Sequence, residues 1–444
     1  MTKQHFGTDG VRGTVGADPM TADFAMRLAS AAAQVLVPEG GTVVIGKDTR
    51  LSGYMFESAL EAGFVAAGAD VLLIGPLPTP GIAHLTQVFE ADLGVVISAS
   101  HNPYDDNGIK FFDRSGSKLS DDIEREIELN LKKPAITLES SKLGKAKRID
   151  TARIRYQEFC ASTFPEDLKL DGVKVVFDGA NGAGYKVGPR TLAHLGAEVI
   201  PIGCSPNGTN INDRCGSTSP ELLQMTVPAV KADVGVALDG DGDRVVMVDE
   251  RGELVDGDQL LYILATARQR DGLLKGPVVG TVMSNLGLEN ALKAENIEFR
   301  RANVGDRYVL EALRETGGII GGETSGHMIV LDRTTTGDGL VCALQVLAVM
   351  KQTGKSLSEL AAGMPKYPQT MLNVRTDKKL DPGTSSAIQE AVVAAEEELK
   401  ETGRVVLRAS GTEPVIRVMV EGENEDQVIA LAKRLAKVVA EAAT

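Results

Sequence analysis

The chain is poor in cysteine and lacks long apolar runs. Its cysteines, Cys160, Cys204, Cys215 and Cys342, form neither a CxxC pair nor a zinc-like spacing, so we expect reduced structural thiols. No uncharged apolar run is long enough to span a bilayer. Residues 1–10 carry polar and charged side chains where a signal peptide needs an apolar stretch. These absences predict a cytoplasmic protein without a membrane partner.

The chain also lacks a positive charge balance and the usual nucleotide motifs. Its formal net charge of −14 argues against a nucleic-acid partner, which would require a broad basic surface. A few converging arginines and lysines could still hold a small anionic ligand. No GxxxxGK[ST] or GxGxxG follows a strand, so nothing supports a nucleotide cofactor, and the GxSxG elbow of hydrolases is absent. The length of 444 residues predicts three or four domains.

Three stretches of the chain read alike. Each contains short β-branched runs that end in Gly-rich loops and alternate with helix-compatible segments. This pattern predicts a mostly parallel sheet covered on both faces, although any α/β protein shows some of the same rhythm. The repeated runs are 42–50, 69–81 and 91–103, then 173–184, 197–208 and 232–244, and finally 277–287, 297–307 and 317–327.

A repeat longer than about 100 residues indicates duplicated domains and not a solenoid. We predict three similar mixed or parallel α/β domains and a smaller α+β C-terminal domain, arranged around a central cleft. The predicted boundaries are 1–152, 153–253, 254–366 and 367–444. Because ligands bind at the carboxyl ends of strands in such sheets, the third loop of each repeat should face one cleft. Those loops are SASHNP, DGDGDR and GGETSGH.

Ser100 lies in the first of these loops, directly after an apolar strand. A serine there is a nucleophile or an ordinary turn residue, and its Asn and Pro neighbours favour turns. The nearby segment 106–110 brings Lys110 close in sequence and favours a chemical role.

Asp239, Asp241 and Asp243 alternate with glycines in the second loop. Three carboxylates so close together need a cation to offset their repulsion. Glu250 has the spacing of the last ligand of an EF-hand, but Arg244 replaces the required glycine and the flanks are strands. With so few protein ligands, the pattern predicts Mg²⁺ completed by water or phosphate oxygens.

The third loop and the C-terminal segment offer polar groups for a ligand. Glu323, Ser325 and His327 could recognise sugar hydroxyls or an amine, and His327 could exchange a proton, or the set could be a polar surface turn. Near the N-terminus, Arg12 lies in a Gly-rich loop that has a functional role or is a flexible terminal loop. A phosphate cradle or an ordinary strand turn is formed by Arg408, Ser410, Gly411, Thr412 and Arg417.

Together, FGTDGVRG, ISASHNPYDDNGIKFF, ALDGDGDR, GGETSGH and RASGTEP resemble the α-D-phosphohexomutase family, in that order and across essentially the whole chain. The resemblance implies that Ser100 is the phosphoserine and that it holds Mg²⁺ with Asp239, Asp241 and Asp243. It implies that Glu323 and Ser325 hold the sugar, while the phosphate that does not react is bound by Arg408, Ser410, Gly411, Thr412 and Arg417. Around the reacting groups it places Arg12, His101, Lys110, Arg244 and His327, with Lys110 or His327 transferring the proton.

The implied reaction moves phosphate between the 6- and 1-positions of a hexose. Thr324 and the segment 332–340 are similar to the glucosamine branch of the family, which implies glucosamine 1,6-bisphosphate as intermediate. Glucose and mannose phosphates remain alternative substrates, and a serine phosphatase or a non-enzymatic binding protein are more distant alternatives. The expected partner is a small phosphosugar, and the chain is expected to be a monomer or a homodimer.

Overall fold

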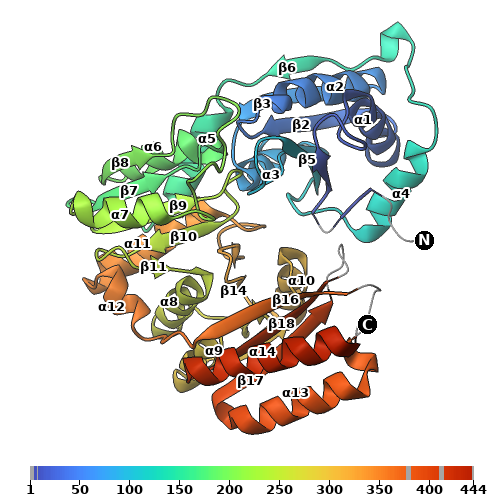
Figure 1. Cartoon of the computed structure of the whole chain (residues 1–444). Helices are drawn as coiled ribbons and strands as arrows, with labels where there is room; N and C mark the ends of the chain where they lie inside the picture. Colours follow the sequence, from blue (N-terminus) through green and yellow to red (C-terminus); the bar gives the residue numbers. More distant parts are fainter. Residues whose placement is uncertain (1–4, 8, 377–381, 410–414, 443–444) are drawn as a thin grey trace.

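In the computed structural model of the chain, three α/β units and a C-terminal α+β domain follow one another around an arc (Figure 1). The structure describes residues 5–7, 9–376, 382–409 and 415–442. Within this part of the chain, none of the helices combines the length and the apolar character needed to cross a membrane.

The first unit is built on a sheet of order β1-β5-β4-β2-β3-β6. Its strands are β1 (Val11–Thr14), β2 (Gly41–Lys47), β3 (Ala69–Pro76), β4 (Leu93–Ile97), β5 (Asp106–Asp113) and β6 (Ala146–Arg148). Its helices are α1 (Ala22–Leu36), α2 (Ser52–Ala66), α3 (Thr79–Val88) and α4 (Asp121–Leu131), with the 3₁₀ turn η1 (Ser140–Lys142).

The second unit has the sheet order β11-β10-β9-β7-β8. Its strands are β7 (Lys174–Asp178), β8 (Glu198–Ile202), β9 (Val234–Leu238), β10 (Val245–Val248) and β11 (Leu254–Val255). Its helices are α5 (Ala152–Ser162), α6 (Val187–His194) and α7 (Glu221–Ala229), with η2 (Ala183–Tyr185).

The third unit has the order β13-β12-β14-β15. Its strands are β12 (Val278–Thr281), β13 (Phe299–Ala302), β14 (Ile320–Gly322) and β15 (Met328–Val330). Its helices are α8 (Gly257–Arg270), α9 (Leu286–Ala294), α10 (Asp306–Thr316), α11 (Gly339–Thr353) and α12 (Leu357–Ala361).

The three sheets share one topology, which confirms the expected fold class. In each, three parallel neighbours have the order β3-β2-β4, β8-β7-β9 or β13-β12-β14. An antiparallel strand then follows the last parallel one: β5 after β4, β10 after β9 and β15 after β14. Each of the three loops predicted to face the cleft connects the last parallel strand with this antiparallel strand. The loops therefore leave the equivalent edge of each sheet.

The central strands are apolar because helices cover both faces of each sheet. All residues of β4 and β9 are buried, as expected for interior strands of a parallel sheet. One hydrophobic core runs continuously through parts of the first unit and into the second and third, from Val44 to Met364. The first unit has a second core under α1 and α2. The α/β units are therefore packed as one body.

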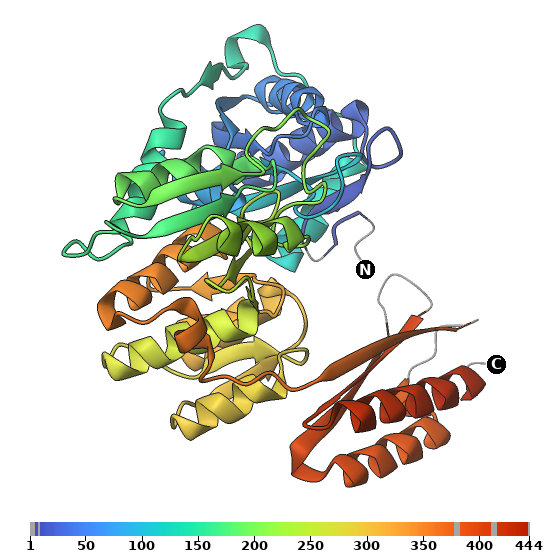
Figure 2. The same ribbon diagram turned by 60° about the vertical axis from the view of Figure 1, so that its left-hand side comes forward.

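The C-terminal domain has a separate core and a simpler sheet of order β16-β18-β17. Its elements are β16 (Gln369–Arg375), η3 (Pro382–Thr384), α13 (Ser386–Leu399), η4 (Lys400–Thr402), β17 (Gly403–Ala409), β18 (Val415–Gly422) and α14 (Glu425–Ala442). Burial alternates along β16, which is typical of a sheet with one covered face. Figure 2 shows this domain projecting from the rest on the segment that leads into β16.

Candidate active site

Ser100 follows the buried strand β4 and is only 2% exposed. Its φ of 52° lies in the left-handed region, where a residue with a Cβ is strained. Hydrogen bonds hold it there: the Ser100 amide donates to Ser98 Oγ over 3.0 Å, and its carbonyl oxygen accepts from Arg50 over 3.2 Å and from Asn212 over 2.9 Å. Because Asn212 belongs to the second unit, the serine loop is fixed from two sides.

The Ser100 hydroxyl points at the aspartate loop. Its Oγ donates a hydrogen bond of 2.6 Å to Asp239 Oδ2, across 139 positions of sequence. His101 Nδ1 lies 3.5 Å from Ser100 Oγ. The connection after β4 and the connection after β9 therefore meet.

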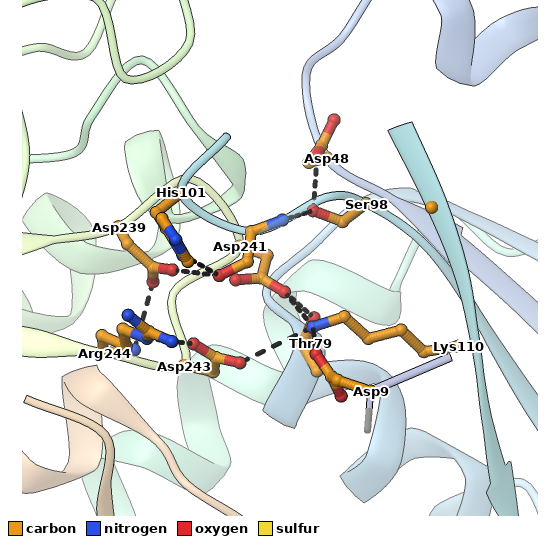
Figure 3. Close-up of polar contacts among 12 residues, drawn as sticks. Asp9, Asp48, Thr79, Ser98, His101, Lys110, Asp239, Asp241, Asp243 and Arg244 are labelled. Atoms are coloured by element: carbon orange, nitrogen blue, oxygen red, sulfur yellow. Dashed lines mark hydrogen bonds and ion pairs between the residues drawn. The ribbon is translucent and has the colours of Figure 1, made fainter. Parts of the chain in front are cut away.

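Asp239, Asp241 and Asp243 form a buried cluster in the loop between β9 and β10 (Figure 3). One carboxylate oxygen from each lies within 4.8 Å of the other two. The Arg244 amide donates to Asp239 Oδ1 over 3.1 Å, and Thr79 Oγ1 donates to Asp241 Oδ2 over 2.6 Å. Asp241 Oδ1 is buried and has no hydrogen-bond partner among the described residues. Hard oxygen ligands with an unused buried acceptor fit a magnesium ion.

Lys110 of β5 supplies part of the charge that this cluster needs. Its Nζ lies 2.9 Å from Asp241 Oδ2, 3.7 Å from Asp243 Oδ2 and 2.8 Å from Asp9 Oδ2. Burial alone would lower the pKa of Lys110, but Asp241 and the other two carboxylates outweigh burial and raise it. Other cations help, since Lys118 and Arg12 also pair with Asp9 and His327 lies beside Asp243. Asp239 has no ion pair among the described residues, which leaves the site attractive to a further cation.

The aspartates share this positive charge unequally. Burial, with repulsion from Asp243 and Asp241, raises the pKa of Asp239 well above its ordinary value. Burial also acts to raise the pKa of Asp243, but Lys110 and His327 outweigh it, so that the pKa falls. Asp239 is thus the acid whose charge is least compensated by protein groups. It is also the acid that accepts the hydrogen bond from the Ser100 hydroxyl.

The two histidines of the site have opposite electrostatics. His327 Nδ1 lies 3.7 Å from Asp243 Oδ1, and its Nε2 lies 3.5 Å from Asp306 Oδ2. Burial opposes the charged form, but the two carboxylates prevail and raise the pKa of His327 to about 9. For His101, burial and then Arg244 and Arg12 lower the pKa to about 4. At neutral pH one imidazole is protonated and the other is not.

A cleft of about 590 Å³ opens in front of Ser100. It brings together most of the residues predicted from sequence: Arg12, Ser100, His101, Asp243, Arg244, Glu323, Ser325, His327 and Arg408. Arg417 lines an adjoining cavity with Arg408, Glu323 and Ser325. Lys110 and Asp239 are buried and contact two of these residues, Asp243 and Ser100 respectively, and the buried Asp241 pairs with Lys110. Ser410, Gly411 and Thr412 lie outside the described residues.

Residues 323–327, which connect β14 with β15, are called the sugar loop below because the family resemblance implies that Glu323 and Ser325 hold the sugar. Glu323 accepts a hydrogen bond of 2.9 Å from the Gly305 amide at the start of α10, and both residues line the cleft. Arg408 and Arg417 are direct cross-strand neighbours on β17 and β18. Arg408 and Arg417 therefore lie next to the loop between β14 and β15 of the third unit.

Sequence reasoning missed several residues of this site. Asp9 and Asp306 line the cleft and are joined by Lys118, whose Nζ is paired with a carboxylate oxygen of each. Arg50 and Asn212 hold the serine loop. Arg50 and Asp306 follow β2 and β13, so the rule that carboxyl ends of parallel strands share an edge could have found them. Lys118 and Asn212 lie in irregular segments and gave no such signal.

The fold and this site together define an enzyme of the phosphohexomutase class. Family models described as phosphoglucomutase/phosphomannomutase match along the chain: domain I at residues 3–136, domain II at 155–252, domain III at 256–367 and the C-terminal domain at 371–438. The chain belongs to the phosphoglucomutase/phosphomannomutase family, which confirms the resemblance drawn from its motifs.

Relatives that match this chain over nearly their whole length are named phosphoglucosamine mutase. The chain is 57% identical over 440 residues to the phosphoglucosamine mutase of Aeromonas hydrophila, covering 99% of each chain. It is 57% identical over 441 residues to that of Nitrosococcus oceani, covering 99% of this chain and 98% of the other. Among solved structures, a phosphoglucomutase/phosphomannomutase family protein from Burkholderia thailandensis superposes with a TM-score of 0.80 at 25% identity, over 98% and 97% of the two chains.

Proposed function

We propose that the chain interconverts glucosamine 6-phosphate and glucosamine 1-phosphate through a phosphorylated Ser100 and a glucosamine 1,6-bisphosphate intermediate. The observation that carries this proposal is the 2.6 Å hydrogen bond from Ser100 Oγ to Asp239, beside a cleft lined by Arg12 and Arg244. The full-length relatives named phosphoglucosamine mutase support glucosamine over glucose or mannose as the sugar.

Two bond exchanges make up the reaction. In the first, the P–Oγ bond of phospho-Ser100 breaks, a bond from that phosphorus to O1 of glucosamine 6-phosphate forms, and the O1 proton leaves. In the second, the reoriented bisphosphate returns its 6-phosphate to Ser100 Oγ, and O6 takes up a proton. Positioning and electrostatic stabilisation supply most of the catalysis in such transfers.

The chain's own residues hold the ends of the substrate. Arg408 and Arg417, with Ser410, Gly411 and Thr412, would bind the phosphate that is not reacting. Glu323 and Ser325 would accept and donate hydrogen bonds to the sugar hydroxyls. Arg12, Arg244 and His101 would surround the reacting phosphate next to Ser100, since all three line the same cleft.

Asp239, Asp241 and Asp243 would hold Mg²⁺ together with the phosphate of Ser100. When bound, the ion offsets negative charge on the transferring group. Lys110 and His327 are the candidates for moving the proton, because each is buried among carboxylates at the edge of this cluster. Variants that keep size but lose the proton, Lys110→Met and His327→Gln, would separate their roles through single-turnover rates.

The phosphoenzyme must be kept from water, or it would hydrolyse. We assign closure to the C-terminal domain, which has its own core and carries Arg408 and Arg417. The proposed domains are 1–152, 153–253, 254–366 and 367–444. We further propose a cytoplasmic enzyme that acts as a monomer or a homodimer on a small phosphosugar.

The decisive test combines intact mass with a substrate panel. Purified protein should carry one covalent phosphate that is lost in Ser100→Ala, and this variant should have no measurable mutase activity. Glucosamine 6-phosphate should be turned over with a higher kcat/KM than the glucose or mannose analogue. Release of inorganic phosphate without the isomer would instead indicate a phosphatase. Full mutase activity in Ser100→Ala would end the proposal.

A further inference from the structure

The N-terminus of α8 contacts both the sugar loop and the segment that leads to the C-terminal domain. Asp256, which caps the helix, pairs with Lys366 Nζ over 2.7 Å. The next residue, Gly257, lies under the sugar loop: its amide donates to the Thr324 carbonyl over 3.1 Å, and a Cβ there would meet the Glu323 carbonyl oxygen at 2.0 Å. Two successive residues thus contact two different functional segments.

Asp258 extends this connection from inside the protein. Its side chain is fully buried, and one oxygen, Oδ2, accepts hydrogen bonds of 2.8 Å from both the Asn285 amide and Thr324 Oγ1. A single atom therefore joins the loop after β12 to the sugar loop. Burial, followed by repulsion from Asp256, raises the pKa of Asp258 to about 6. An apolar side chain at this position would avoid the free-energy cost of burying a carboxylate. The two hydrogen bonds to Asn285 and Thr324 are what the carboxylate provides in return.

Asn285 passes the connection to the interdomain segment. Its Nδ2 donates to the Tyr367 carbonyl over 3.0 Å, and its Oδ1 accepts from the Tyr367 amide over 3.0 Å. The neighbouring Gly287 lies so close to the Pro365 carbonyl oxygen that a Cβ would meet it at 2.0 Å. The loop that Asp258 holds is therefore also the clamp on residues 365–367.

The C-terminal domain also contacts the loop after β12, through Arg404. Arg404 donates to the Val282 carbonyl over 2.9 Å and to the Ser284 carbonyl over 2.6 Å, and it is paired with the fully buried Glu421. Any movement of the loop must shift either the Tyr367 clamp or the Arg404 contacts. Those contacts in turn set where Arg408 lies, four residues further along β17.

We propose that Asp258 couples the sugar loop to the joint of the C-terminal domain, so that a sugar held at Glu323 and Ser325 sets the position of Arg408 and Arg417. Asp258 is a positioning residue, because it acts through Thr324 and Asn285. The proposal rests on the proposed function for the roles of the sugar loop and the two arginines.

The first test needs no substrate and uses two substitutions of similar size. Asn at position 258 can place its carbonyl oxygen where Oδ2 lies and accept both bonds, whereas Leu cannot accept either. Hydrogen exchange of the intact protein should show the Tyr367 amide exchanging roughly tenfold faster or more in Asp258→Leu, and within about threefold of wild type in Asp258→Asn. An unchanged Tyr367 amide in a folded Asp258→Leu protein would overturn the coupling.

The second test uses kinetics with glucosamine 6-phosphate. Asp258→Leu should lower kcat/KM by roughly tenfold or more, with changes in both kcat and KM, while Tm is not reduced. Asp258→Asn should stay within about threefold of wild type. A fall in activity that only parallels a fall in Tm would mean a structural role and would refute the proposal.

A double-substitution cycle measures the energetic coupling between Asp258 and Asn285 directly. Asn285→Asp keeps the acceptor for the Tyr367 amide but loses the Nδ2 donor. If both residues act in one relay, the combined effect of Asp258→Leu and Asn285→Asp should be smaller than the product of the two single effects. Independent, multiplicative effects would overturn the relay.

Should Asp258→Leu fail to fold, Thr324→Val cuts the same connection from the loop side. In wild type, glucosamine 6-phosphate should slow exchange of the Tyr367 amide, and in Thr324→Val this protection should be lost. Retained protection would refute the coupling. A wild-type protein that turns over no glucosamine 6-phosphate would refute the proposed function alone, since the exchange experiment without substrate still decides the role of Asp258.

Discussion

Asn212 donates a hydrogen bond of 2.9 Å to the carbonyl oxygen of Ser100, although the two residues lie 112 positions apart. The same amide group also lies 3.0 Å from the Asn102 carbonyl oxygen, so it bonds to both ends of the turn from Ser100 to Asn102. Arg50 reaches the same two carbonyl oxygens from the first unit. A strained backbone persists only where its surroundings determine it this fully.

Removing one of these grips should slow catalysis without unfolding the protein. We expect Asn212→Ala to lower kcat roughly tenfold, because the Ser100 turn can then relax away from φ 52° and the hydroxyl leaves its aligned position. KM should change little. Steady-state kinetics with the phosphorylated enzyme measure the effect, and Asn130→Ala, at a half-buried position of α4 that does not line the cleft, is the control. Wild-type kcat in Asn212→Ala would show that Arg50 and Ser98 suffice to fix the turn.

The aspartate loop should make activity dependent on magnesium. Asp241→Asn removes one charge from the cluster while keeping its size and the Thr79 contact, and we expect kcat to fall roughly a thousandfold. The magnesium concentration that gives half-maximal activity should also rise. Titration of MgCl₂ into chelator-treated enzyme measures both quantities.

The matched control for this experiment is Asp213→Asn, because Asp213 is exposed and outside the cluster. It should leave the magnesium dependence unchanged. Full activity of the wild-type enzyme in excess chelator, after exhaustive dialysis, would contradict the metal assignment.

Much of this arrangement could be predicted from the sequence. Apolar runs such as Leu93–Ile97 and Val234–Leu238 required buried parallel strands, and the residues directly after them had to lie at one edge of a sheet. The threefold similarity then implied that the loops carrying Ser100 and Asp239 would face the same cleft. The structure places the two side chains within hydrogen-bond distance.

The remaining residues could not be found by that rule. Lys118 lies between β5 and α4, and its partners Asp9 and Asp306 are more than 100 positions away, so no local pattern links them. Asp258 resembles an ordinary acidic residue in the first turn of a helix, where acids are favoured anyway. Its role depends on which loops pack against α8, and the packing of separate units is not written in any short motif.

The C-terminal arginines should govern binding more than chemistry. Arg417→Gln removes a charge from the cavity between the third unit and the C-terminal domain, and we expect KM for the phosphosugar to rise roughly 10- to 100-fold. The kcat should fall less, since the proposed reaction has the reacting phosphate at Ser100. Arg434→Gln, on the exposed surface of α14, is the control. A pure kcat effect would place Arg417 with the reacting group instead.

A buried acid at the start of α11 gives a prediction about pH and stability. Asp338 caps α11, accepts a hydrogen bond of 2.8 Å from Tyr156 Oη, and is 2% exposed. Burial raises the pKa of Asp338 to about 6, above its ordinary 3.8. The folded state therefore holds this proton more tightly. The stability that the proton contributes is complete below about pH 4 and is lost as pH rises through 6.

Asp338→Asn should remove this pH dependence, because the amide is neutral and can still cap α11 and bond to Tyr156. We expect a gain on the order of 2–3 kcal/mol at pH 8 and about a third of that at pH 4.5. Tm measured at both pH values checks this, with Asp213→Asn as the exposed control. An equal gain at both pH values would show that packing, and not the proton, is responsible.

Lys118 provides the last prediction, because it connects Asp9 of the first unit with Asp306 of the third. Both acids line the cleft that must admit an anionic phosphosugar, and the Lys118 charge offsets them. In Lys118→Met the cleft becomes more negative by one charge, so KM should rise roughly tenfold and grow less sensitive to added salt. Lys118→Arg restores the charge and should stay within about threefold of wild type. If Met and Arg gave the same KM, with equal losses of Tm, Lys118 would serve only to fasten the two units, and its effect on substrate would be indirect.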